Sequence, residues 1–201
     1  MKHTLLKMSA ALLVASQLTA CIAPLAVGAI AGGAMAVSDR RTFGSNASDR
    51  QIEFRASNAI GSTFPKAHVN SQVYNASVLL TGEVASVDEG RNVEALVRTL
   101  PNVRGVVNEL GVGQPSSLGA RASDTAITTK VNSAFLTDKL IQSGAFTVTT
   151  ERGIVYLQGR VSNAEGARAA ELARTVSGVR TVVKVFEYLT DEEFRRLNIK
   201  S

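Results

Sequence analysis

The sequence has few of the residues on which disulfides, metal sites and aromatic stacking depend. Its 201 residues include one cysteine, two histidines and no tryptophan. A single cysteine excludes an intramolecular disulfide, so stability has to come from hydrophobic cores. The scarcity of aromatic side chains leaves little surface on which the bases of single-stranded nucleic acid could stack. We therefore expect no nucleic-acid partner.

The sequence also lacks the common motifs of catalytic and metal sites. His3 lies in an N-terminal segment that we expect to be removed, which leaves His68 as the one remaining histidine. Without a second histidine, a cysteine cluster or a carboxylate-rich loop, we predict no metal site and no cofactor. No Gly-x-Ser-x-Gly motif or phosphate-binding glycine loop occurs. The sequence therefore predicts a binding protein rather than an enzyme, with His68 at the surface.

The N-terminus contains an export signal built around the lone cysteine. A basic start precedes an apolar run, Leu5 to Ala15, that is too short to span a bilayer of about 30 Å. Leu18-Thr19-Ala20-Cys21 follows and resembles the lipobox of bacterial lipoproteins. The resemblance implies that residues 1–20 are cleaved and that Cys21 carries S-diacylglycerol and an N-acyl chain such as palmitate. The alternative is an ordinary secretory cleavage site that happens to lie near a cysteine.

The residues after the lipobox form a predicted tether. Ile22 stands where an aspartate would resemble an inner-membrane retention signal, so we expect a lipid-anchored protein in the outer membrane, facing the periplasm. Residues 21–47 begin as an apolar segment rich in Gly and Ala and become polar toward their end, which is typical of a tether. Gly28 and Gly32 have the spacing of a close helix contact, so a small helix-pairing element is the alternative.

The rest of the chain consists of two copies of one unit, offset by about 76 residues. Val78 to Val84 (VLLTGEV) matches Val155 to Val161 (VYLQGRV), and Ser48-Asp49 matches Ser123-Asp124. The predicted divisions are a first domain at 48–112, a linker at 113–122, a second domain at 123–188 and a C-terminal tail at 189–201.

Each copy is predicted to be α+β, in the order α-β-β-α-β, with two helices packed on one face of a small mixed sheet. We expect Ser48-Asp49 and Ser123-Asp124 to cap the first helix of each copy. In the second copy, two strands flank the hairpin signal Arg152-Gly153, and an Ala-rich helix follows at 164–176. A Val-rich strand closes each unit. In the tail, 190–197 is predicted to form a short exposed helix.

This order, with a Gly-x-Val strand end, an Ala-rich helix and a Gly-Val-x-x-Val strand, resembles the BON domain of bacterial envelope proteins. The resemblance covers residues 48–111 and 123–188. Together with the lipobox, it makes the chain similar to the dual-BON outer-membrane lipoproteins associated with division and outer-membrane stress. The resemblance implies that the second domain binds anionic phospholipid, such as phosphatidylglycerol, mainly through its first helix. It also implies a role in envelope integrity and at division sites.

The residues of that helix agree with a shallow membrane contact. At 100° per residue, the inward face consists of Ile127, Val131, Ala134 and Phe135. An outward leucine lies near lysines that suit an anionic bilayer. In the family pattern, a tryptophan occupies the position of Ala126. Its absence from this chain weakens the expected membrane contact or shifts it toward Leu136, Leu140 and Ile141. The candidate phospholipid-contact residues are Ala126, Thr129, Lys130, Ser133, Leu136, Thr137, Lys139 and Leu140.

The sequence leaves a second function open. In that alternative the domains bind an envelope protein, a division protein or peptidoglycan, and the acyl anchor alone holds the membrane. Charge favours lipid only slightly, because residues 123–188 carry eight basic and six acidic side chains against six and seven in 48–111. The lipid hypothesis requires that the first domain leave the first helix of the second domain uncovered.

Overall fold

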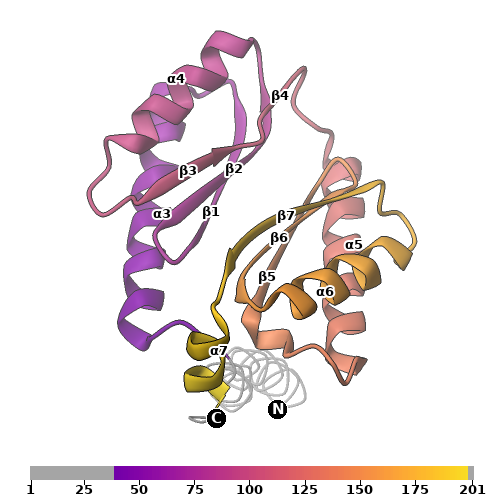
Figure 1. Ribbon diagram of the computed structural model, residues 1–201. Helices are drawn as coiled ribbons and strands as arrows, with labels where there is room; N and C mark the ends of the chain where they lie inside the picture. Colours follow the sequence, from indigo (N-terminus) through magenta and orange to yellow (C-terminus); the bar gives the residue numbers. More distant parts are fainter. Residues whose placement is uncertain (1–38, 199–201) are drawn as a thin grey trace, which may run out of the picture. The chain divides into compact units, whose positions relative to one another are not determined.

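The computed structural model describes residues 39–198, which form two copies of an αββαβ unit and a short C-terminal helix (Figure 1). This confirms the predicted α+β fold class and the two tandem domains. The first copy contains α3 (Phe43–Thr63), β1 (His68–Tyr74), β2 (Ser77–Val84), α4 (Val87–Arg98), β3 (Gly105–Asn108) and β4 (Gly111–Val112). The second contains α5 (Leu118–Thr137), β5 (Phe146–Glu151), β6 (Ile154–Val161), α6 (Asn163–Thr175) and β7 (Thr181–Tyr188), and α7 (Asp191–Asn198) follows.

Both sheets are mixed and share one topology. β1 and β2 form an antiparallel hairpin, β3 pairs in parallel with β2, and the short β4 extends the same edge. In the second copy β5 and β6 are antiparallel, and β7 runs parallel to β6. The two-residue turns have positive φ at both positions, 49° and 62° at Asn75 and Ala76 and 54° and 73° at Arg152 and Gly153. Such turns match the right-handed twist of a hairpin, and the second confirms the hairpin predicted there.

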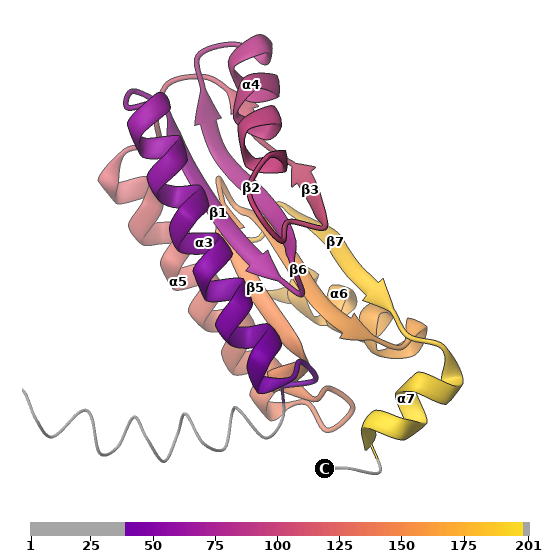
Figure 2. The ribbon, with the colours of Figure 1, turned by 90° about the vertical axis from the view of Figure 1, so that its left-hand side faces the viewer.

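Each copy has its own hydrophobic core, between its helix pair and one face of its sheet. Alternate residues of the central strand supply the sheet side of this core. They are Val78, Leu80 and Val84 in β2, and Val155, Leu157 and Val161 in β6. The helices lie on the outer side of each sheet, as Figures 1 and 2 show.

The opposite faces of the two sheets pack against each other. Leu79 and Tyr156 alternate with the core residues of their strands and belong to neither core, yet they are 0% and 1% exposed. Tyr74, at the end of β1, donates its hydroxyl hydrogen to the carbonyl of Ala145 at 3.4 Å, and its oxygen accepts from the backbone N–H of Arg160 at 3.2 Å. The two copies therefore form one unit, with sheets inside and helices outside.

The first helix of each copy begins earlier than predicted. Its N-cap is Thr42 in α3 and Ser117 in α5, and each cap side chain accepts a backbone N–H of the first turn. The prediction that Ser48-Asp49 and Ser123-Asp124 cap these helices is wrong. The helices begin within the segments predicted as tether and linker.

The two aspartates of that motif instead join each long helix to its hairpin turn. Asp49 lies buried inside α3, and its carboxylate accepts the backbone N–H groups of Asn75 and Ala76, both at 2.7 Å. Asp124 in α5 binds Arg152 and Gly153 in the same way, both at 2.8 Å. One carboxylate can satisfy both turn donors because it offers two acceptor oxygens.

The later helices lie close to their predicted positions. α6 starts with a capping box, in which the Ser162 hydroxyl accepts the Glu165 N–H while the Glu165 carboxylate accepts the Ser162 N–H. α7 confirms the short helix predicted in the tail. Its preceding residue, Thr190, accepts the N–H of Glu193 at 3.3 Å.

Candidate functional site

The predicted contact residues lie on the outer side of α5 and in the loop that follows it. All eight are exposed, so the first copy covers none of them, as the lipid hypothesis requires. Ile127, Val131 and Phe135 form the buried stripe of α5, as the helical spacing predicted. Leu136 and Leu140 are 62% and 72% exposed, whereas Ile141, to which the contact was also expected to shift, is buried.

The hydroxyl groups on this face bond to their own helix. Thr129 donates to the carbonyl of Thr125 at 3.0 Å, Ser133 to that of Thr129 at 2.9 Å, and Thr137 to that of Ala134 at 3.0 Å. These bonds persist when water is removed from the surface, which lowers the cost of desolvating a polar group. The face can therefore approach an apolar environment at little cost.

The charged side chains near the end of α5 sum to a net positive charge. Among residues 39–198, Lys130 and Lys139 have no carboxylate partner. The carboxylate of Asp138 is bound by the Arg168 guanidinium at 2.8 Å. Hydrogen bonds from Arg168 and from the Leu140 N–H hold the pKa of Asp138 below its usual value. The acid next to the lysine thus stays ionised and neutralised.

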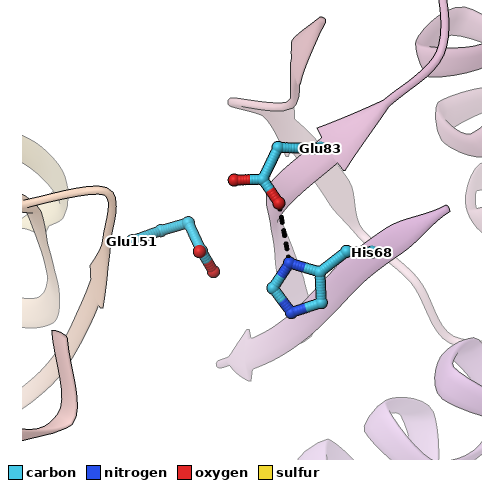
Figure 3. A group of neighbouring side chains, drawn as sticks. All are labelled: His68, Glu83 and Glu151. Carbon is cyan, nitrogen blue, oxygen red and sulfur yellow. Dashed lines mark hydrogen bonds and ion pairs between the residues drawn. The ribbon is translucent and has the colours of Figure 1, made fainter. Parts of the chain in front are cut away.

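A polar cluster lies between the two copies, and His68 belongs to it (Figure 3). His68 of β1 and Glu83 of β2 face each other in the hairpin register, and Nδ1 lies 2.8 Å from the carboxylate. The third member is Glu151 at the end of β5. The prediction of a surface position for His68 is wrong, because its side chain is only 14% exposed. The sequence gives no signal that residues so far apart come together.

Three potential metal ligands meet in this cluster. One ligand atom from each of His68, Glu83 and Glu151 lies within 4.8 Å of the others, and imidazole with carboxylates is a ligand set that Zn²⁺ accepts. Protein groups already bind two of them. Glu83 accepts the Ser116 N–H at 3.0 Å and lies 3.7 Å from the Arg152 guanidinium, and Glu151 accepts from the Asn70 amide at 2.9 Å. We assign the cluster a linking role between the copies.

Two pockets, of about 460 and 440 Å³, lie along the seam between the copies. In the larger, the carboxylate of Glu187 is bound by Arg104 at 2.7 Å, by Arg160 at 3.1 Å and by the Asn75 amide at 2.7 Å. Burial would raise the pKa of Glu187, but these donors hold it below its usual value. Glu151 lines the smaller pocket. These acids serve contacts that join the copies.

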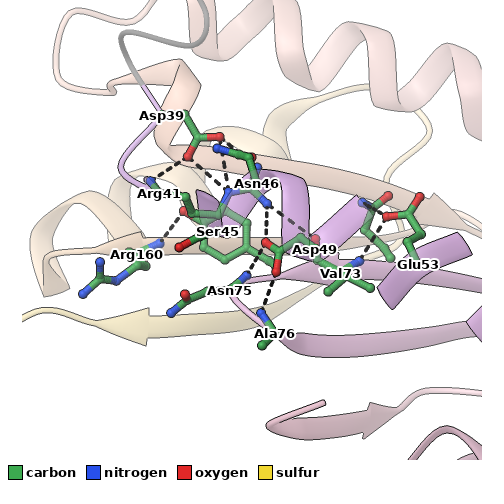
Figure 4. A network of polar contacts seen from close by, with 12 residues as sticks. Asp39, Arg41, Ser45, Asn46, Asp49, Glu53, Val73, Asn75, Ala76 and Arg160 are labelled. Atoms are coloured by element: carbon green, nitrogen blue, oxygen red, sulfur yellow. Dashed lines mark hydrogen bonds and ion pairs between the residues drawn. The ribbon is translucent and has the colours of Figure 1, made fainter. Parts of the chain in front are cut away.

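An arginine network fixes the segment before α3 (Figure 4). Arg41 pairs with Asp39 at 2.8 Å and with Asp49 at 3.0 Å, and its guanidinium lies 4.2 Å from the centre of the Tyr74 ring. Burial would lower the pKa of Arg41, but the carboxylates raise it above its usual value. The segment is thereby held on the first copy.

The neighbouring Arg40 holds the same segment on the second copy. It is 7% exposed, and its two terminal nitrogens bind the two oxygens of Glu165 at 2.8 and 2.6 Å. It also donates to the carbonyl of Arg160 at 2.9 Å and to the Gln142 side chain at 3.0 Å. Sequence analysis missed this contact because the segment was assigned to the tether.

Within residues 39–198, no helix is both long enough and apolar enough to cross a bilayer. Cys21 and most of the predicted tether lie outside the described residues. Acylation at Cys21 therefore stays a prediction.

The fold defines the protein as a tandem αββαβ repeat, and comparison with known proteins identifies the repeat. The BON domain model matches residues 48–114 and 123–190. The chain is 35% identical over 178 residues to the outer membrane lipoprotein DolP of Haemophilus influenzae, covering 86% of this chain and 90% of that protein. It is 30% identical over 154 residues to the 21 kDa hemolysin of Actinobacillus pleuropneumoniae, covering 75% and 79%. It is 32% identical over 108 residues to Osmotically-inducible protein Y of Escherichia coli, covering 52% and 54%.

The chain belongs to the BON-domain family, as a dual-BON outer-membrane lipoprotein. It is a cell-envelope protein, lipid-anchored in the outer membrane and facing the periplasm, as the sequence predicted.

Proposed function

We propose that this lipoprotein binds anionic phospholipid, such as phosphatidylglycerol, through the outer face of α5 and the loop after it, without catalytic turnover. This binding supports envelope integrity and action at division sites, as the family resemblance implies. The observation that carries the proposal is the exposure of Leu136 and Leu140 beside Lys130 and Lys139, which have no carboxylate partner among residues 39–198. Lysines attract lipid phosphates, while leucines enter the acyl boundary.

The expected affinity is low. Two lysines contribute about 1 kcal/mol each near an anionic surface, and partial burial of two leucines adds roughly 3 kcal/mol. A total of about 5 kcal/mol corresponds to a dissociation constant on the order of 10⁻⁴ M. An acyl anchor on the same chain raises the local concentration of the domain at the bilayer to about the millimolar range. Weak recognition is therefore enough to bias the position of an anchored protein.

The test uses the soluble chain from Asp39 onward, which contains both cores, and follows its amide resonances while anionic micelles are added. We expect shifts concentrated on Lys130 to Ile141, and loss of binding in the Lys130→Glu, Leu136→Glu double variant. Arg50→Glu, Phe54→Glu on α3 is the matched control, because both residues are exposed and the charge change is the same.

Three results would decide the question. Binding that fails in the α5 variant and persists in the α3 control supports the proposal. Absence of amide resonance shifts on α5 in the unmodified chain would refute the proposal. If the chain still captures an envelope protein or peptidoglycan after the α5 substitutions, the alternative is favoured, in which the domains are an interaction module that does not bind lipid.

A further inference from the structure

The start of α3 and the end of α5 lie at the same end of the described unit, although they belong to different copies. Figures 1 and 2 both show this arrangement. Arg40, just before α3, bonds to Gln142 in the loop after α5 and to Glu165 at the start of α6. The bidentate pair with Glu165 is strong and directional, so it fixes the segment before α3 to the start of α6, and the bond to Gln142 joins that segment to the loop after α5.

Three exposed apolar side chains lie at this end. Phe43, the first residue of α3, is 91% exposed and lies three positions after Arg40. Leu140 lies two positions before Gln142, and Leu136 is one turn further back on α5. One largely exposed phenylalanine from the first copy and two largely exposed leucines from the second therefore mark the same end of the unit.

The geometry points to one end-on membrane surface, made of Phe43, Leu136, Lys139 and Leu140, in which the first copy contributes the aromatic side chain. We call it the tether-end surface. This inference rests on the proposed phospholipid binding, and it adds a residue outside α5 and an orientation of the protein on the bilayer. It also supplies an aromatic ring that α5 lacks at Ala126.

The partner is an anionic bilayer because of where the chain enters and how the charges are arranged. Asp39, the first described residue, lies at this end, so the segment that leads back to the lipid anchor joins the unit here. Three carboxylates close by are each bound by an arginine: Asp39 by Arg41, Asp138 by Arg168 and Glu165 by Arg40. Lys139 has no such partner among residues 39–198.

α7 packs at the same end and adds one net negative charge there. Its Phe194 ring lies 5.0 Å from the Arg40 guanidinium. α7 carries three carboxylates, Asp191, Glu192 and Glu193, against two arginines; Glu192 pairs with Arg196, and Glu193 accepts hydrogen bonds from the N–H and the hydroxyl of Thr190. Lys139 is therefore the group of the tether-end surface that attracts lipid phosphate.

The test uses the full acylated lipoprotein in vesicles that contain phosphatidylglycerol. Cys21 is the sole cysteine and its thiol is predicted to be acylated, so an introduced cysteine is expected to be the only free thiol. Phe43→Cys, Leu140→Cys and Phe54→Cys are each labelled with an environment-sensitive fluorophore, and nitroxide lipids serve as quenchers. Phe54 is the matched control, since it is 68% exposed on the same helix, about 16 Å further along the axis.

We expect the probes at 43 and 140 to shift to the blue and to be quenched at least threefold more than the probe at 54. Equal quenching at 43 and 54, with strong quenching at 140, would overturn the inference and leave phospholipid binding by α5 standing. Quenching at 43 alone would overturn both. Shielding of the probe at 43 in native envelopes but not in vesicles would show that a protein covers it, and would overturn the assignment to lipid.

Discussion

Asp124→Ala should destabilise the protein strongly, because the Asp124 carboxylate holds the hairpin turn to α5 and does not cap the helix. Its two oxygens accept the N–H groups of Arg152 and Gly153 at 2.8 Å each, and the residue is 6% exposed. A hydrogen bond to a charged group contributes about 1.5 to 3 kcal/mol. The Gly153 N–H is buried and has no replacement acceptor, whereas water can reach the Arg152 side of the turn. We therefore expect a loss of about 3 kcal/mol in the free energy of unfolding.

Asp124→Asn is the informative second variant, because it preserves the shape of the side chain. Asparagine has one carbonyl oxygen and one amino group, so it can accept from one turn N–H and must present a donor to the other. We expect a loss of about 2 kcal/mol, between that of alanine and no change.

The measurement is urea unfolding of the soluble chain from Asp39 onward, followed by circular dichroism and tyrosine fluorescence. Ser123→Ala is the control, since Ser123 is the exposed neighbour on α5 and has no side-chain partner among residues 39–198. It should change stability by less than about 0.5 kcal/mol. A loss below about 1 kcal/mol for Asp124→Ala would refute the argument that the carboxylate holds the hairpin turn to α5.

Two further changes test the backbone and the polar cluster. Gly82 has a φ of 113°, and a methyl group there would collide with the His68 carbonyl oxygen, so Gly82→Ala should cost more than about 2 kcal/mol in urea unfolding. Gly61 lies on α3 with open space around it, so Gly61→Ala should instead raise the free energy of unfolding by about 0.5 kcal/mol. Equal changes in stability for the two glycine variants would contradict this account. Burial raises the pKa of the Glu151 carboxyl in the folded protein, so its ionised form lowers the free energy of unfolding at neutral pH. This loss of stability disappears below about pH 4.3, the pKa of the carboxyl in the unfolded chain. Glu151→Gln should raise the urea midpoint at pH 7 and have little effect near pH 4, and the opposite pH trend would refute the assignment.

Local signals in the sequence predicted the elements that local interactions determine. The Arg152-Gly153 pair predicted the hairpin, because both turn positions need positive φ and glycine accepts it without strain. The helical spacing of Ile127, Val131 and Phe135 predicted which face of α5 is buried and therefore which residues are exposed. This helical spacing alone predicted most of the candidate phospholipid-contact surface.

The starts of the first helices could not be predicted in this way. Aspartate is common at N-caps because its carboxylate accepts backbone N–H groups. At Asp49 and Asp124 the same chemistry serves the N–H groups of a hairpin turn about 27 residues further along the chain. The residue type is identical in the two cases, so only the tertiary contact distinguishes them.

A signal for the packing of the two sheets was present in the strands themselves. Val78, Leu79 and Leu80 are three consecutive apolar residues, and Val155, Tyr156 and Leu157 repeat the run. A strand with only one buried face alternates between apolar and polar residues, so continuous runs indicate burial on both faces. The runs did not reveal what covers the second face, which is the sheet of the other copy.

The sheet-to-sheet packing limits how the protein can meet a bilayer. Because the sheets are inside, the exposed regions are the outer helix faces and the two ends of the unit, and α3 and α5 lie on opposite sides in Figure 1. A flat membrane can therefore follow one helix face or one end, but not both helix faces. Contact at the tether end would be strongest at Leu136 to Leu140 and would decline toward Ala126, which is ten residues, or about 15 Å, further back along α5. An aromatic ring at position 126 contributes least in that orientation, whereas one at Phe43 contributes most.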